Sequence, residues 1–209
     1  MMAKIHPDFA RRRLSPHFVY ESYDSDTGLF FNRGSVGFVL LASPLVGTSV
    51  QAQGEIAEFI KNEENLPADS SLQILMIGSN KIEHFLNNWL AYRTEELFAD
   101  LAAKRTEFFR QKAQIGEVRD VVVLISITIP SIATDLENMQ RRRENLQNIL
   151  TSIGLYTDWV NSQTLIDLLR NIFGWQDKTE YPDINDHEVL SEQILRPDFS
   201  MVEQDEMIL

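Results

Sequence analysis

The sequence of 209 residues contains no cysteine. Disulfide bonds and thiolate metal sites are therefore excluded, and a reducing compartment is the simplest interpretation. Long hydrophobic runs are also missing, because no apolar stretch approaches the ~20 residues that cross a bilayer. The basic run Arg11-Arg12-Arg13 near the N-terminus is not followed by the apolar segment of a signal peptide.

Basic charge is scarce. The chain has 19 Lys and Arg residues against 31 Asp and Glu residues, a formal net charge of −12. The imbalance is strongest after Trp175, where ten acidic residues face only Lys178 and Arg196. Nucleic-acid binding needs a basic footprint, so we expect no direct binding of nucleic acid by this chain.

The motifs of common catalytic sites are missing as well. No GxxxxGK[ST] loop is present to hold nucleotide phosphates, and neither an HExxH helix nor a GxSxG turn occurs. The four histidines are scattered and do not have the spacing of metal ligands. They are His6, His17, His84 and His187. The sequence therefore predicts no catalytic, cofactor-binding or metal-binding residue, although a pair of carboxylates brought together by folding stays open.

The pattern that is present is typical of an α+β domain. Two apolar runs around Asn32-Arg33-Gly34-Ser35 predict a β-hairpin, and the second run, 36–41, is apolar on both faces. Further strands are predicted at 72–77, 121–129 and 155–160, with helices between them. A helical insertion at 82–113 is much longer than its neighbours and fits either one helix or two helices with a bend. Without the insertion, the order matches a ferredoxin-like antiparallel sheet with helices on one face.

The segment that opens the domain also carries a resemblance. The run Tyr20-Glu21-Ser22-Tyr23, followed by Thr27-Gly28-Leu29-Phe30 and Val36-Gly37-Phe38, resembles the start of the TraC-type ATPases. These are the pilus-assembly ATPases of F-like conjugative type IV secretion systems. The likeness covers most of residues 18–200 and is one of pattern and order, since none of its motifs is catalytic.

The resemblance implies a function without catalysis. In that family the N-terminal region docks the motor on inner-membrane components of the secretion system and helps it to oligomerise. The nucleotide site lies C-terminal to it, so ATP and Mg are expected for the full-length parent and no cofactor for this chain. The family also implies a hexamer in full-length form, in the cytoplasm and peripheral to the inner membrane.

The resemblance and the composition together predict three parts. Residues 1–17 are expected to form an irregular basic arm, and residues 18–174 the α+β domain. Residues 175–209 are expected to form an acidic, extended tail with at most one short helix near Glu188 to Ile194. The apolar end Met207-Ile208-Leu209 looks like the start of a strand, which suggests that a C-terminal motor domain follows in a longer protein.

Two basic clusters are the candidate docking residues. One lies in the later half of the helical insertion and the other on the helix predicted before Gly154. They comprise Lys104, Arg105, Arg110 and Lys112, and Arg141, Arg142 and Arg143. Each cluster fits either a docking face for an acidic partner or a solvated helical face. Two other functions stay open: a free-standing ferredoxin-like interaction module and a small hydrolase.

Overall fold

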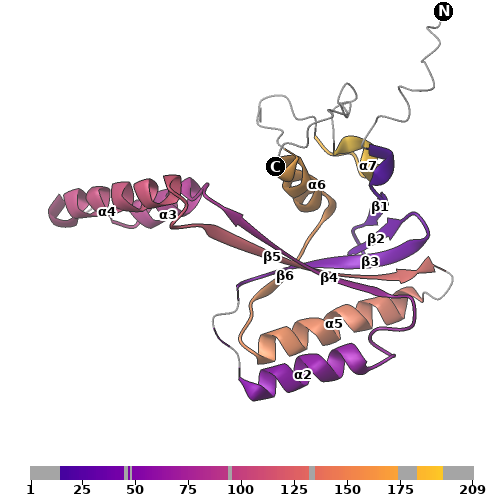
Figure 1. Cartoon of the computed structure of the whole chain (residues 1–209). Coiled ribbons are helices and arrows are strands. Elements are labelled where there is room, and N and C mark those ends of the chain that lie inside the picture. Colours follow the sequence, from indigo (N-terminus) through magenta and orange to yellow (C-terminus); the bar gives the residue numbers. More distant parts are fainter. Residues whose placement is uncertain are drawn as a thin grey trace, which may run out of the picture.

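A six-stranded antiparallel sheet lies at the centre of the described part of the protein (Figure 1). The computed structural model describes residues 15–44, 47, 49–93, 96–131, 135–173 and 183–194. The strands are β1 (Tyr20–Asp24), β2 (Leu29–Asn32), β3 (Ser35–Ala42), β4 (Ser71–Ser79), β5 (Asp120–Pro130) and β6 (Thr157–Trp159). Their order is β1-β2-β3-β5-β4, and β6 also pairs with β3. Of the predicted basic arm, only the 3-10 turn η1 (Ser15–His17) belongs to the described residues.

Strand β3 is the central strand, as predicted. It follows β2 through a two-residue turn, Arg33-Gly34, in which Gly34 has a φ of 83°. It pairs with β5 along its whole length, while β2 and β6 share its other edge. Phe38 and Leu40 are buried on one face and Val39 is 9% exposed on the other. The predicted hairpin and its two-sided burial are confirmed.

Two helical crossovers connect the central strands. Helix α2 (Val50–Lys61) joins β3 to β4, and helix α5 (Leu136–Ser152) joins β5 to β6. Because all pairings are antiparallel, β3 and β4 run parallel on either side of β5, and β5 and β6 run parallel on either side of β3. The order β6-β3-β5-β4 is therefore two interleaved split βαβ units. The predicted α+β class with an antiparallel sheet is confirmed.

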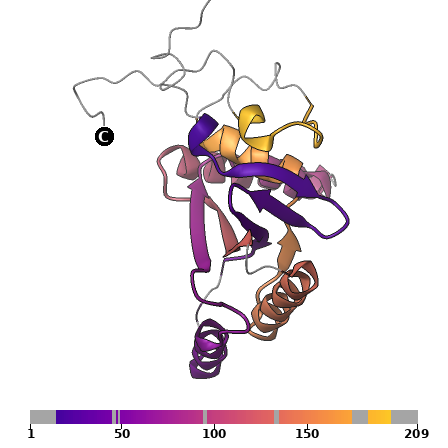
Figure 2. The same ribbon diagram turned by 90° about the vertical axis from the view of Figure 1, so that its right-hand side faces the viewer.

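Helices lie on both faces of the sheet (Figures 1 and 2). The two crossover helices α2 and α5 pack on the same face with Phe59, Met139 and Leu146, as predicted for the ferredoxin-like core. Helices α6 (Ser162–Ile172) and α7 (Leu190–Gln193) form a second apolar cluster on the other face. Leu190 and Ile194 are fully buried there. The sequence allowed one short helix near Glu188 to Ile194 in the acidic tail, and α7 lies within that range. This segment also packs onto the domain.

The helical insertion is a pair of helices that projects from the sheet (Figure 1). Helix α3 (Glu83–Ala91) follows β4 and helix α4 (Glu96–Gln114) precedes β5. The two helices pack side by side and are called the arm below. Of the two predicted possibilities for residues 82–113, the interrupted helix is the one observed.

The central position of β3 gives a stability prediction. Leu40→Ala should lower the free energy of unfolding by ~2–5 kcal/mol, because it removes buried methyl groups and leaves a cavity. Denaturant melts followed by circular dichroism measure this loss. The matched control is Leu101→Ala at a position 64% exposed on α4, expected to change stability by less than about 0.5 kcal/mol. Equal effects at the two positions would contradict the central role of β3.

Candidate functional site

The arm is held together by a narrow seam of its own. Ile82 and Leu86 from the α3 side meet Ala113 of α4, with Phe109 and Val118 packed against them. Farther along α4, Ala102 is buried and the Thr106 hydroxyl donates a hydrogen bond of 2.9 Å to its carbonyl oxygen. Each helix of the arm therefore buries one stripe, and its remaining surface faces outwards.

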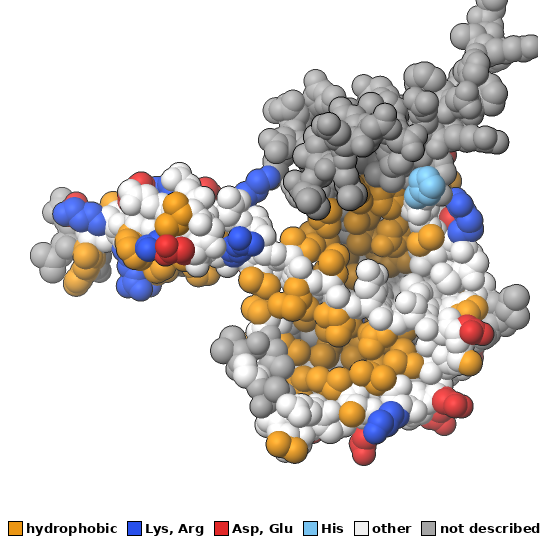
Figure 3. Space-filling model, in the orientation of Figure 1, with side chains coloured by type: hydrophobic (Ala, Val, Ile, Leu, Met, Phe, Trp, Pro, Cys, Tyr) orange, Lys and Arg blue, Asp and Glu red, His pale blue; other side chains and the backbone are white. Residues whose placement is uncertain are grey.

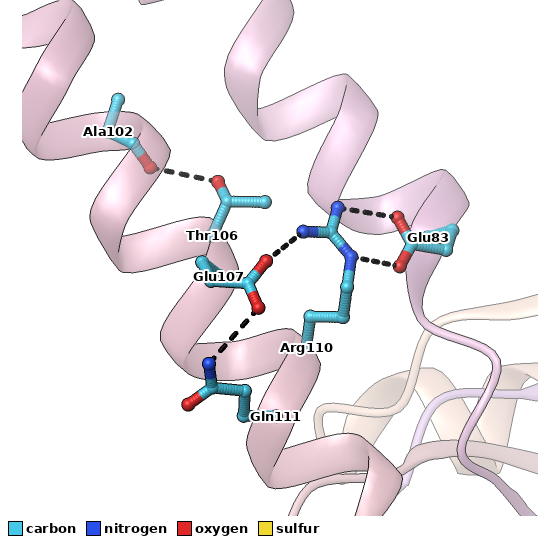
Figure 4. Close-up of polar contacts among 6 residues, drawn as sticks. All are labelled: Glu83, Ala102, Thr106, Glu107, Arg110 and Gln111. Carbon is cyan, nitrogen blue, oxygen red and sulfur yellow. Dashed lines mark hydrogen bonds and ion pairs between the residues drawn. The ribbon is translucent and has the colours of Figure 1, made fainter.

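Arg110 joins the two helices of the arm (Figure 4). Its Nε and Nη2 donate hydrogen bonds of 2.6 and 3.0 Å to the carboxylate of Glu83 on α3. Its Nη1 donates one of 2.6 Å to Glu107, which also accepts from Gln111. Hydrogen bonding to Arg110 holds the pKa values of Glu83 and Glu107 below their ordinary range. The bidentate geometry fixes the spacing of the helices.

A cleft of about 500 Å³ lies in the part of the arm farthest from the sheet. We call it the tip cleft. Its lining is aromatic, aliphatic and cationic: Trp89, Tyr92, Arg93, Phe98, Leu101, Ala102 and Arg105. Tyr92 is 88% exposed, and Phe98 and Leu101 are more than half exposed. Such a concentration of accessible aromatic and Arg side chains is typical of binding hot spots.

Two guanidinium groups surround Trp89 in the tip cleft. The Arg93 guanidinium lies 4.1 Å from the ring centroid of Trp89, and its Nη1 donates a hydrogen bond of 2.8 Å to the Trp89 carbonyl oxygen. The Arg105 guanidinium lies 5.6 Å from the same ring and 5.7 Å from that of Phe109. These cation–π contacts orient positive charge beside an apolar surface.

The predicted basic residues of the insertion therefore have different surroundings. Arg105 lines the tip cleft, whereas Arg110 pairs with two exposed carboxylates, one on α3 and one on α4. Lys104 pairs with Asp100 at 2.8 Å on a well-exposed face, and Lys112 pairs with Glu117 at 2.5 Å. The structure thus places Arg105 alone of these four residues in the lining of the cleft.

Most residues of the tip cleft were not among the predicted site residues. Leu101 and Phe108 have the helical spacing of a buried apolar stripe, yet both are exposed. The signal that could have revealed this is a second stripe at heptad-like spacing, displaced from the seam. It runs through Phe98, Leu101, Arg105, Phe108, Lys112 and Ile115.

The three arginines on α5 do not form one exposed cluster. Arg141 is exposed and lies 3.6 Å from Glu137, while the Arg142 Nε donates a hydrogen bond of 2.6 Å to the Glu64 carbonyl oxygen. Arg143 is only 2% exposed. The prediction that it belongs to a docking surface is therefore wrong.

Arg143 instead ties α5 to the β1–β2 turn. Its Nη1 donates a hydrogen bond of 2.5 Å to the Thr27 carbonyl oxygen, and its guanidinium lies 3.7 Å from the ring centroid of Trp159. Gly28 has a φ of 67°, and a side chain there would collide with the guanidinium. Burial lowers the pKa of Arg143. The stacked ring and the carbonyl oxygen replace part of the lost hydration, while the buried Nε has no hydrogen-bond partner among the described residues.

A second hollow, of about 730 Å³, lies where the arm meets β4, β5 and α6. Its polar lining includes Lys81, His84, Arg119 and Asn171, and none of its described lining residues is a carboxylate. A hydrolase site with converging carboxylates, which the sequence left open, would need a different lining. Within the described ranges, no three His, Asp or Glu side chains lie close enough together to hold a metal ion.

A comparison with protein families assigns the chain to a family. A family model described as TraC protein matches residues 14–209, which is nearly the whole chain. The chain belongs to the TraC family. Membership implies a part in conjugative type IV secretion. No curated protein and no solved structure matches the chain. Among the described residues of this TraC protein, no helix has the length and apolar character needed to cross a membrane.

The buried position of Arg143 generates a second prediction. Arg143→Ala should lower the free energy of unfolding by roughly 2 kcal/mol or more, because it removes a charged hydrogen bond and a cation–π contact. Arg141→Ala, on the same helix but exposed, should stay within about 0.5 kcal/mol. Urea melts of the two variants test the difference. Indistinguishable midpoints would show that the Arg143 contacts do not stabilise this TraC protein.

Proposed function

We propose that this chain is a non-catalytic docking and oligomerisation domain of a conjugative type IV secretion ATPase. The observation that carries the proposal is the tip cleft, an accessible aromatic and cationic surface on an arm that projects from the sheet. The arm has its own seam and its own ion-paired network, so a partner can bind its tip without disturbing the central core.

The chemistry of the cleft indicates the chemistry of its partner. Trp89, Tyr92 and Phe98 offer apolar area, and Arg93 and Arg105 offer positive charge at its border. A segment that carries aromatic or aliphatic anchors flanked by carboxylates fits both features, because apolar anchors supply affinity and complementary charge orients the encounter. We propose that such a segment belongs to an inner-membrane component of the secretion system.

This role gives the chain a place in a larger assembly. The full-length protein would work in the cytoplasm, peripheral to the inner membrane, as a hexameric motor in pilus assembly and DNA transfer. ATP and Mg would bind C-terminal to this chain, and nucleic acid would not contact it directly. The net charge of −12 supports the last point, because a polyanion would be repelled.

The assignment of nucleotide binding to another part of the protein predicts how the chain responds to ATP. Isothermal titration of residues 1–209 with ATP and magnesium should show no saturable heat, because the chain lacks a phosphate-binding loop. A one-site isotherm with a micromolar dissociation constant would contradict the proposal that the nucleotide site lies outside this chain.

Docking through the tip cleft predicts a specific charge-reversal phenotype. Arg105→Glu in the full-length protein should reduce its recovery with the membrane fraction and lower conjugation frequency in donor cells. We expect about a tenfold loss or more, because a hot-spot side chain contributes at least ~1.4 kcal/mol to binding. Lys61→Glu, the same reversal at an exposed position on α2 that belongs to neither predicted basic cluster, is the matched control and should leave both measurements near wild type.

Thermal melts separate docking from folding in this experiment. Both variants should melt close to wild type, since each change is on the surface. Wild-type membrane recovery and conjugation for a folded Arg105→Glu protein would rule out the tip cleft as the docking site. Equal losses for Arg105→Glu and Lys61→Glu would show a general effect of negative charge, which would also contradict the proposal.

A further inference from the structure

Among the described residues, strand β4 forms an edge of the sheet without the usual protection against pairing. It has nine residues and pairs with β5 without interruption from Ser71 to Ser79. No described strand pairs with its other side. The sequence SLQILMIGS contains neither a charged residue nor proline. Natural sheets usually shield an edge with charge, proline, a bulge or a short strand, so an edge without these features is suited to pairing with another strand.

The opposite edge shows the contrast within the same sheet. Strand β1 has five residues, carries Glu21 and Asp24, and has an irregular register between Tyr20 and Ser22. Helix α7 also contacts it. Strand β1 therefore has features that oppose pairing with a further strand, and the described residues of β4 have none of them.

Both faces of β4 expose apolar side chains. Ile74 is 62% exposed and Met76 66% exposed on the face that carries α2 and α5. Leu75 is 38% exposed on the other face, where it lines a groove together with Leu168 and Leu169 of α6. Figure 3 shows hydrophobic side chains gathered over the sheet beside the arm. An added strand would bury side chains on both faces, as well as satisfying the edge backbone.

We propose that β4 of a second copy of this chain occupies this edge, antiparallel and related by a two-fold axis at Leu75. Leu75 then lies opposite Leu75 of the copy, Ile74 opposite Met76, and Ser71 opposite Ser79. Paired residues point to the same face of an antiparallel sheet, and each of these pairs satisfies that condition. The two sheets join into one continuous twelve-stranded sheet, since each contributes six strands.

Charge complementarity supports this pairing and this occupant. Asp69 lies two residues before β4 and Lys81 two residues after it, in the segments that flank the strand. The two-fold axis at Leu75 therefore brings the acidic flank of each copy to the same end of the pair as the basic flank of the other. Both side chains are exposed, and neither forms an ion pair within the described residues. In an isologous interface the same surface of both copies meets, so the two ends of that surface must be complementary to each other.

The interface is separate from the proposed docking role. The arm leaves the sheet at the C-terminal end of β4, so the antiparallel pair directs the two arms to opposite ends of the dimer (Figure 1). Each tip cleft stays accessible. Loss of the dimer and loss of docking can therefore be measured independently.

The absence of cysteine makes a cross-linking test direct. Analytical ultracentrifugation of residues 1–209 should show a reversible monomer–dimer equilibrium. Leu75→Cys should then form a disulfide-linked dimer under mild oxidation, because the two residues meet at the axis within disulfide reach. Tyr156→Cys, at a position 85% exposed and outside β4, reports random collision and should cross-link far more slowly.

A mixing experiment tests the register. Ser71→Cys and Ser79→Cys proteins should each resist cross-linking alone, because equivalent residues lie ~27 Å apart at eight residues of offset. A mixture of the two should yield the cross-linked heterodimer. Cross-linking of either protein alone, or equal rates for Leu75→Cys and Tyr156→Cys, would overturn the proposed pairing.

A charge on the edge should abolish the dimer. Met76→Lys places like charges on facing strands and should shift the sedimentation of the chain to that of a monomer, with an unchanged circular dichroism spectrum. Gln53→Lys, an exposed position on α2, is the control and should leave the dimer intact. A wild-type chain that sediments as a monomer at all concentrations, or a Met76→Lys protein that still dimerises, would overturn the proposal.

Discussion

The burial of β3 on both faces and along both edges is the constraint on which the rest of the structure depends. β5 occupies one edge of β3, and β2 and β6 share the other. α2 and α5 cover one face and α6 and α7 the other, in two separate apolar clusters. Because each layer packs on this strand, β4 becomes an edge and the arm emerges between β4 and β5, away from both clusters.

The two candidate surfaces follow from that arrangement. The arm is a pair of helices, so each helix can bury only one stripe and the second apolar stripe of α4 stays outside. Near Trp89, part of that stripe lines the tip cleft together with side chains of α3, and two arginines lie beside the Trp89 ring. Among the described strands, β4 pairs only with β5 and therefore lies at the edge of the sheet. Its uncharged sequence is nevertheless typical of a strand with neighbours on both sides. Both surfaces offer apolar area where a soluble monomer would carry charge.

Much of the fold was predictable because local patterns specified it. The alternation and turn chemistry around Gly34 fixed the hairpin, and the uncharged runs at β4 and β5 identified the strands. β1 was not predicted, since its segment reads as polar and turn-forming. Its strand depends on pairing with β2 and on Tyr20 and Tyr23 packing beside Phe30. Such pairing is a tertiary contact that local propensity does not encode.

The sequence by itself determined the α+β class, the order of the elements, the TraC resemblance and the lack of a phosphate-binding loop. Each of these features depends on patterns or motifs of residues that are close together in the sequence. Tertiary structure alone decided which arginine is buried, because Arg141, Arg142 and Arg143 are adjacent and differ only in the direction they leave α5. It also decided that Leu101 is a surface residue and that β4 is an edge. Exposure depends on which elements pack against a residue, and a chain specifies those neighbours only once it has folded.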